Sequence, residues 1–124
     1  MAKTILVVDD SATVRKLIIY ALDPNNYNCL EASDGMEALE KMAQNPVDLV
    51  IADLNMPKMT GLELVRTIRR GNKDIPVIML TTQADEESKK EGLEAGANVY
   101  LVKPAPRHLL LYKVRSLLGE ELAE

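Results

Sequence analysis

Five short apolar runs alternate with five stretches of helical character along this chain, and that alternation restricts its fold more than any other feature. Four of the runs, at residues 4–8, 49–53, 77–81 and 99–102, are rich in aliphatic and β-branched residues, as buried strands are. The run at residues 27–32 is weaker in apolar character, so we expect it near an edge of the sheet. Strand–helix–strand units connect through right-handed crossovers and give a parallel sheet with helices on both faces. We therefore expect a single α/β domain over residues 1–124, with a doubly wound, five-stranded parallel sheet in the order 2-1-3-4-5.

The helical stretches place apolar residues three and four positions apart, which indicates one buried face on each helix. The expected core positions are Val14, Leu17, Ile18, Ala21 and Leu22, then Met36, Leu39, Met42 and Ala43, then Leu64, Val65 and Ile68, and finally Leu110, Val114, Leu117 and Leu118. Ser11 is placed to cap the first helix. Asp34 and Glu37 have the spacing of a capping box at the start of the second helix.

Residues 85–95 form the one helical stretch that is polar on nearly every side, and it contains an internal glycine. A helix with so few apolar residues has little tertiary packing to hold it. We expect it to be the least stable helix, and its polar surface is interpreted either as an ordinary solvated face or as a mobile interaction surface.

Polar residues follow the strands at the points where their carboxyl ends should meet. Asp9 and Asp10 follow the first strand, Asp53 ends the third, Thr81 ends the fourth and Lys103 follows the fifth. Each of them alone has an ordinary structural explanation, as a loop, capping or solvated residue. Ligands of open α/β sheets bind at this edge, between the first and third strands. Their joint placement therefore predicts a functional site.

The residue types narrow the chemistry of that site. Three carboxylates in one crevice repel one another, and a hard divalent cation with oxygen ligands relieves that repulsion. Mg²⁺ suits such a site, with Mn²⁺ as an alternative, because it leaves positions open for phosphate oxygens. Lys103 offers a charge and Thr81 a hydroxyl to a phosphoryl group. A carboxylate is then able to act as the nucleophile and form an acyl phosphate.

Composition excludes several other roles. The net charge is −4 with no basic stripe, and there are four Tyr but no Phe or Trp, so nucleic acid binding is not expected. Cys29 is the only cysteine, which we interpret as a buried structural thiol. No apolar run is long enough to span a membrane and no signal peptide is recognisable at the N-terminus. We expect a cytoplasmic protein without membrane contact.

Five motifs combine these residues, at 7–11 (VVDDS), 53–57 (DLNMP) with Gly61, 80–82 (LTT), 92–97 (GLEAGA) and 100–104 (YLVKP). Together they resemble the receiver domain of two-component response regulators, and the single-domain chemotaxis regulators especially. The resemblance extends over essentially all 124 residues and implies a flavodoxin-like (βα)5 fold. It also implies a signalling domain whose only catalysis is its own phosphorylation and dephosphorylation.

By that resemblance, Asp53 is the phosphoacceptor and takes its phosphoryl group from the phosphohistidine of a histidine kinase. Asp10, Asp53 and the backbone carbonyl of Asn55 would bind Mg²⁺ directly, with Asp9 acting mainly through water. Lys103 and Thr81 would contact the phosphoryl group, and Thr82 lies next to them in the phosphoryl-binding set.

The resemblance also implies a switch. Tyr100 would turn inward as Thr81 moves toward the phosphoryl group, and the Lys103–Pro104 peptide bond would be cis. The fourth helix, fifth strand and fifth helix would then form the face that a downstream protein reads. We expect a monomer that is able to dimerise on phosphorylation.

Two positions depart from the family pattern. Ala105 stands where a bulky residue, commonly Phe, often follows the Lys-Pro pair, and Pro106 restricts Ala105 to extended conformations. The start of the last helix should therefore pack unusually. Thr82 stands where a smaller residue is usual, and our hypothesis is that it narrows access to Asp53 for small donors and water.

Other protein classes use parts of this residue set. A phosphatase of the haloacid-dehalogenase type needs a second Asp two residues after its nucleophile, where this chain has Asn55. A flavodoxin-like cofactor carrier needs hydrogen-bond donors after its first strand, where Asp9 and Asp10 would repel phosphate. A receiver without phosphoryl chemistry is disfavoured because none of the expected site residues is missing. We favour a free-standing regulator, from the absence of linker composition in residues 120–124, over the receiver part of a larger transcriptional regulator.

Overall fold

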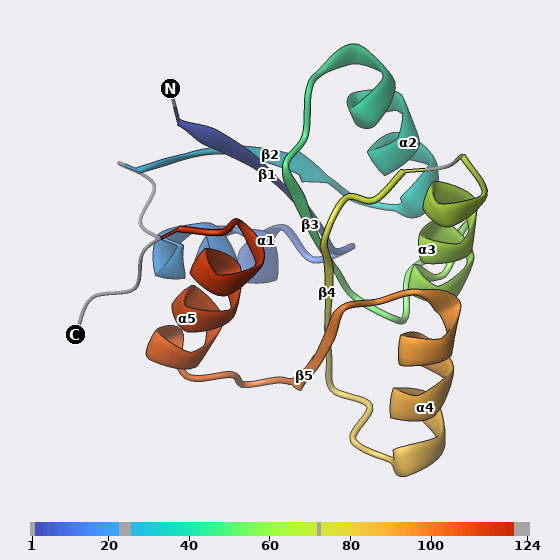
Figure 1. Cartoon of the computed structure of the whole chain (residues 1–124). Coiled ribbons are helices and arrows are strands. Elements are labelled where there is room, and N and C mark those ends of the chain that lie inside the picture. The colour runs from blue at the N-terminus through green and yellow to red at the C-terminus, as the bar shows by residue number, and fades with distance from the viewer. Residues whose placement is uncertain (1, 23–25, 72, 121–124) are drawn as a thin grey trace.

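The computed structural model describes residues 2–22, 26–71 and 73–120, which form a sheet flanked by helices (Figure 1). Five parallel strands make up the sheet, and their neighbours follow the order β2-β1-β3-β4-β5. They are β1 (Lys3–Val8), β2 (Tyr27–Ala32), β3 (Leu49–Ala52), β4 (Val77–Thr81) and β5 (Val99–Val102). The predicted fold class and strand order are confirmed.

The five helices are α1 (Ala12–Ala21), α2 (Gly35–Gln44), α3 (Gly61–Arg70), α4 (Glu86–Ala95) and α5 (Arg107–Leu117). In Figure 1, α1 and α5 lie on one side of the sheet and α2, α3 and α4 on the other. Alternate residues of a strand point to opposite faces, so β1 supplies Ile5 and Val7 to the core under α1 and α5. Leu6 and Val8 enter the core under α2 and α3. The sheet thus separates two apolar cores.

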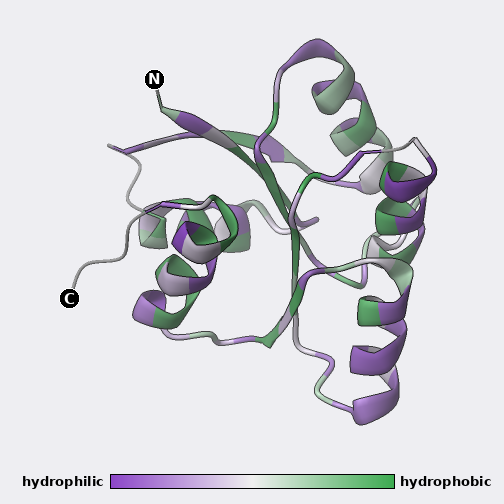
Figure 2. Ribbon diagram, in the orientation of Figure 1, coloured by the Kyte–Doolittle hydropathy of each residue, from purple (hydrophilic) through white to green (hydrophobic). Residues whose placement is uncertain are grey.

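Hydropathy follows this layering (Figure 2). The strands are mainly hydrophobic, whereas α4 is hydrophilic over most of its length. Gly92 is the buried residue of α4, which agrees with the polar pattern of residues 85–95. No helix in the described part of the chain is long and apolar enough to cross a membrane.

The buried faces of α1 and α2 are narrower than predicted. Leu17 is 64% exposed, because the sheet covers the side of α1 that carries Ile18. On α2 the covered stripe consists of Gly35, Ala38, Leu39 and Met42. Met36 and Ala43 are both exposed, since they lie seven residues apart along the border of that stripe. The predicted inward packing of Leu17, Met36 and Ala43 is therefore wrong.

Side-chain caps fix where the helices begin. The Ser11 hydroxyl accepts a hydrogen bond from the Val14 amide at 3.2 Å, as predicted. Asp34 accepts from the Glu37 amide at 2.8 Å. The Glu37 carboxylate, however, accepts from the amide of Ser33, one residue before the cap. The predicted capping box of α2 is therefore displaced by one residue.

Cys29 is only half-buried, not fully buried as predicted. β2 is an edge strand whose single neighbour is β1, so its side chains are less completely covered. Burial raises the pKa of the thiol, and the negative charge of Glu31 adds to that effect.

Candidate functional site

Three acids meet at the carboxyl edge of the sheet. Asp9 directly follows β1, Asp10 comes next, and Asp53 directly follows β3. Because β1 and β3 are neighbouring parallel strands, their ends bring the three side chains together. One carboxylate oxygen from each lies within 4.8 Å of the others. The structure therefore assembles the acid cluster that the sequence suggested.

Hydrogen bonds fix both the side chain and the backbone amide of Asp9. Its side chain is buried, and Oδ1 accepts a hydrogen bond from the Ser11 amide at 2.9 Å. Oδ2 accepts one from Lys103 Nζ at 2.7 Å. Its amide donates to the carbonyl of Ala32 at 3.1 Å. A buried carboxylate needs partners of this kind, so Asp9 is a fixed part of the site.

Lys103 joins two of the acids. Its Nζ lies 2.7 Å from Asp9 Oδ2 and 3.5 Å from Asp53 Oδ2. The side chain is only 18% exposed, so its charge acts in a partly desolvated setting and offsets the repulsion between the two carboxylates. The Lys103–Pro104 peptide bond is cis, as the resemblance implied.

Asp53 opens the loop between β3 and α3. Its Oδ1 accepts a long hydrogen bond, 3.4 Å, from the amide of Asn55, which is exposed. The loop contains a tight turn in which the Met59 amide donates to the Pro57 carbonyl at 2.7 Å. Lys58, between them, has a φ of 68°, and such a turn fixes the loop in a conformation that few side chains favour.

Gly61 brings the start of α3 against the end of β3. Its amide donates to the Leu54 carbonyl at 2.8 Å. A Cβ at this position would lie 2.3 Å from the carbonyl oxygen of Asp53. Only glycine permits this approach, and the approach sets where the Asp53 backbone lies.

Thr81 and Tyr100 are linked through one residue. Thr81 is completely buried, and its hydroxyl accepts a hydrogen bond from the Gln83 amide at 3.3 Å. Tyr100 is also buried, and its hydroxyl donates to the Gln83 carbonyl at 2.7 Å. The Thr81 hydroxyl thus bonds a backbone amide and not an acid. Thr82 is exposed beside it.

The Tyr100 ring is turned inward and lies over α4. A Cβ on Gly92 would come within 2.9 Å of the ring, so the glycine makes room for it. Burial raises the pKa of the Tyr100 hydroxyl, and the negative charges of Asp85 and Asp53 raise it further. The neutral hydroxyl that donates to Gln83 is therefore the favoured form.

Ala105 lines a cavity of about 220 Å³ between α1 and α5. Leu17, Ile18 and Leu110 are among the other residues of its wall. The cavity is consistent with the expectation that a small residue here leaves the start of α5 packed unusually.

The acid cluster suits a hard divalent cation. Carboxylate oxygens are the ligands that Mg²⁺ prefers, at about 2.0–2.1 Å, and Mn²⁺ accepts the same donors. Asp9 is held by the protein, whereas Asp10 is exposed and Asp53 partly so. The two more accessible acids leave room for water or a second ligand on the same ion.

Asp10→Asn is expected to raise the melting temperature in chelator by a few degrees. Lys103 forms ion pairs with Asp9 and Asp53, so the charge of Asp10 adds repulsion that the variant removes. Mg²⁺ should stabilise the unmodified protein more than the variant. Thermal unfolding with and without Mg²⁺ measures both effects. Asp74→Asn is the control, since Asp74 is an exposed acid outside the cluster. An unchanged or lower melting temperature for Asp10→Asn in chelator would contradict the expected repulsion.

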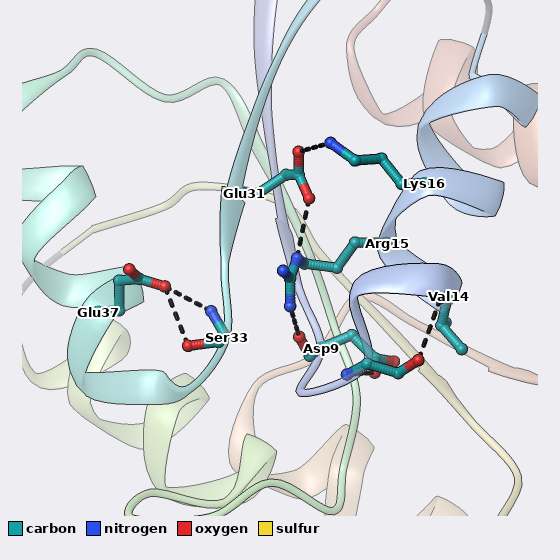
Figure 3. Close-up of polar contacts among 8 residues, drawn as sticks. Asp9, Val14, Arg15, Lys16, Glu31, Ser33 and Glu37 are labelled. Carbon is teal, nitrogen blue, oxygen red and sulfur yellow. Dashed lines mark hydrogen bonds and ion pairs between the residues drawn. The ribbon is translucent and has the colours of Figure 1, made fainter.

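One network beside the cluster was not foreseen from the sequence (Figure 3). Arg15 connects the backbone of Asp9 to the side chain of Glu31. Hydrogen bonds from Lys16 and then from Arg15 hold the pKa of Glu31 below its usual range. The sequence does indicate the position of Glu31, because strand alternation places it on the same face of β2 as Cys29, toward α1. The partner on α1 was not apparent from spacing alone.

Comparisons with known proteins agree on one family. Residues 5–115 match the family described as the response regulator receiver domain. The chain is 43% identical over 119 residues to chemotaxis protein CheY1 of Helicobacter pylori, covering 93% of this chain and 96% of that protein. It is 42% identical over 113 residues to the phosphate regulon transcriptional regulatory protein PhoB of Pseudomonas aeruginosa. That match covers 89% of this chain and 49% of PhoB.

Solved structures give the same result. The chemotaxis protein CheY4 of Vibrio cholerae superimposes with a TM-score of 0.87 at 38% identity, over 94% of this chain and 99% of that one. The chain spans about half the length of several of the curated relatives that it matches, PhoB among them.

Proposed function

Because the chain belongs to the family of response regulator receiver domains, we propose that it accepts a phosphoryl group on Asp53 from the phosphohistidine of a histidine kinase. The reaction would depend on Mg²⁺. The observation that carries this proposal is the cluster of Asp9, Asp10 and Asp53 at the edge of the sheet, with Lys103 placed against two of the three acids.

Asp53 is the acid best placed to react. Both oxygens of the buried Asp9 are engaged, by the Ser11 amide and by Lys103. Asp53 is more accessible, and its contacts within the described part of the chain are a long hydrogen bond from the Asn55 amide and a 3.5 Å ion pair with Lys103. In the proposed step, a carboxylate oxygen of Asp53 attacks phosphorus as the bond to the donor nitrogen breaks, which forms an acyl phosphate.

The other residues would bind and neutralise the transferred group. Mg²⁺, held by Asp10, Asp53 and the carbonyl of Asn55 with Asp9 acting through water, would supply positive charge to the phosphoryl oxygens. Lys103 would exchange its ion pair with Asp53 for one with a phosphoryl oxygen. The hydroxyl of Thr81 would donate to a second oxygen, and Thr82 would border the entrance.

The switch would act through Gln83. Its amide donates to Thr81 and its carbonyl accepts from Tyr100. A Thr81 hydroxyl that moves toward Asp53 would therefore release the amide of a residue whose carbonyl Tyr100 also holds. We propose that this coupling changes the face formed by α4, β5 and α5, on which Leu93 and Val102 are exposed. A downstream protein would read that face, either by binding a monomer or by favouring a dimer.

Two settings for the domain stay open, and the likeness to CheY1 over 96% of that protein supports a free-standing, chemotaxis-type regulator in the cytoplasm. The alternative is the receiver part of a larger transcriptional regulator, which the likeness to half of PhoB supports. A phosphatase of the haloacid-dehalogenase type is disfavoured, since Asn55 stands where that chemistry needs a general acid.

Incubation of the protein with a panel of phosphorylated histidine kinases tests the proposal. One phosphoryl group per chain should appear by intact mass in Mg²⁺ and should be absent in chelator. It should be released by hydroxylamine, as an acyl phosphate is. Pull-downs with and without beryllofluoride would then identify the proteins that read the α4-β5-α5 face. Labelling that is equal in chelator, or absent with every kinase, would overturn the proposed function.

A further inference from the structure

Arg15, near the start of α1, reaches two groups at once (Figure 3). Its Nη1 donates to the backbone carbonyl of Asp9 at 2.7 Å, and its Nε donates to Glu31 Oε1 at 2.9 Å. The side chain is 16% exposed, compared with 70% for Lys16. Lys16 donates to the other carboxylate oxygen of Glu31 at 2.6 Å, and within the described residues it makes no hydrogen bond to Asp9.

The carbonyl that Arg15 holds belongs to the peptide bond between Asp9 and Asp10. The amide of Asp9 and both of its side-chain oxygens bond other groups. The hydrogen bond from Arg15 to the Asp9 carbonyl therefore fixes the plane of the Asp9–Asp10 peptide bond. The Asp10 carboxylate makes no hydrogen bond or ion pair with any residue that the structure describes. Its direction therefore depends on the backbone that carries it.

We infer that Arg15 is a positioning residue that orients Asp10 toward the acid cluster, so that the affinity of the cluster for a divalent cation depends on Arg15. The planar guanidinium bonds a carbonyl and a carboxylate together, which a single ammonium group does not reproduce. Glu31 balances the charge of Arg15, so the guanidinium adds little net repulsion toward a cation. This inference rests on the metal site of the proposed function.

Arg15→Lys tests geometry at constant charge. Direct calorimetric titration with Mg²⁺ should give a dissociation constant about tenfold higher than that of the unmodified protein, the lower end for loss of an outer-shell partner. The control is Lys16→Arg, the converse exchange on the same partner Glu31, which should stay within about twofold of the unmodified protein. An equal loss in both variants would overturn the inference, because it would reflect the Glu31 ion pairs and not the contact with Asp9.

Arg15→Ala separates positioning from charge. Removing a positive charge near a cation site would by itself tighten Mg²⁺ binding, whereas loss of positioning weakens it. We expect weaker binding in Arg15→Ala and none of this weakening in Lys16→Ala. Tighter or unchanged binding in Arg15→Ala would overturn the inference.

The NMR chemical shift of the Asp10 backbone amide reports the local geometry and does not depend on the overall stability of the fold. It should shift in Arg15→Lys before Mg²⁺ is added, and it should not shift in Lys16→Arg. If the unmodified protein fails to bind Mg²⁺, both the metal site and the inference fail. If it binds Mg²⁺ and Arg15→Lys binds equally well, the inference alone fails.

Discussion

Asp53→Asn is expected to abolish phosphoryl transfer to this protein, with a loss of at least about a thousandfold, as for other removed nucleophiles. The amide keeps the size of the side chain and one ligand oxygen, but it lacks the charged oxygen that attacks phosphorus. Lys103 loses an ion pair at 3.5 Å and keeps its shorter one to Asp9, so the site should stay assembled. Intact mass after incubation with a phosphorylated kinase measures the loss.

The neighbouring acids make this result informative. Asp9 and Asp10 each place an oxygen within 4.8 Å of an Asp53 oxygen, so either is close enough to be considered as a second acceptor. Peptide mapping of any residual product distinguishes them. Asp74→Asn, outside the cluster, should be labelled like the unmodified protein. Full labelling of Asp53→Asn would mean that another residue is the acceptor.

Gly61→Ala is expected to destabilise the fold by about 3 kcal/mol, at the upper end of the usual cost of overpacking. The new Cβ would lie 2.3 Å from the Asp53 carbonyl oxygen and 2.9 Å from Leu54 Cα. Both are backbone atoms, so no side-chain rotation relieves the clash. α3 must move away from the end of β3, and the hydrogen bond from the Gly61 amide to Leu54 is lost. The melting temperature should fall by about 10 °C, and phosphoryl transfer should fall with it.

Gly71→Ala provides the matched control at the other end of α3. A Cβ there would meet Ile68 and Thr67 carbonyl oxygens at 3.4 and 3.7 Å, which is ordinary contact, and its φ of −76° suits any residue. Stability should change by no more than about 0.5 kcal/mol. If Gly61→Ala were as harmless as Gly71→Ala, the close approach would have no role in placing Asp53.

The strand order and the proximity of the acids are predictable from the sequence because both follow from the geometry of a parallel sheet. In a parallel sheet every strand ends at the same edge, so the positions of Asp9, Asp53 and Lys103 after their strands already imply proximity. No side-chain detail is needed for that step. The cis Lys103–Pro104 bond came from the resemblance and not from the residues alone, since X–Pro bonds are mostly trans.

What the sequence did not predict depends on contacts between elements. The exposure of Leu17 depends on how wide a face of α1 the sheet covers, and helical spacing does not predict the width of that face. The hydrogen bond from Arg15 to Glu31 needs the register that sets Glu31 opposite Val7. The two hydrogen bonds to Gln83 depend on the path of the loop after β4. Each of these is decided by packing geometry, which spacing does not encode.

Gly92 is the buried residue of α4, and the ring of Tyr100 lies against it. Most of the helix therefore contributes little to the core, and its outer positions are able to change with little cost to stability. A duplicated copy of such a gene would accept substitutions along α4 while the acid cluster at the sheet edge stayed intact. The same separation would let two copies in one cell diverge in the surface of α4 while they kept the same sheet edge.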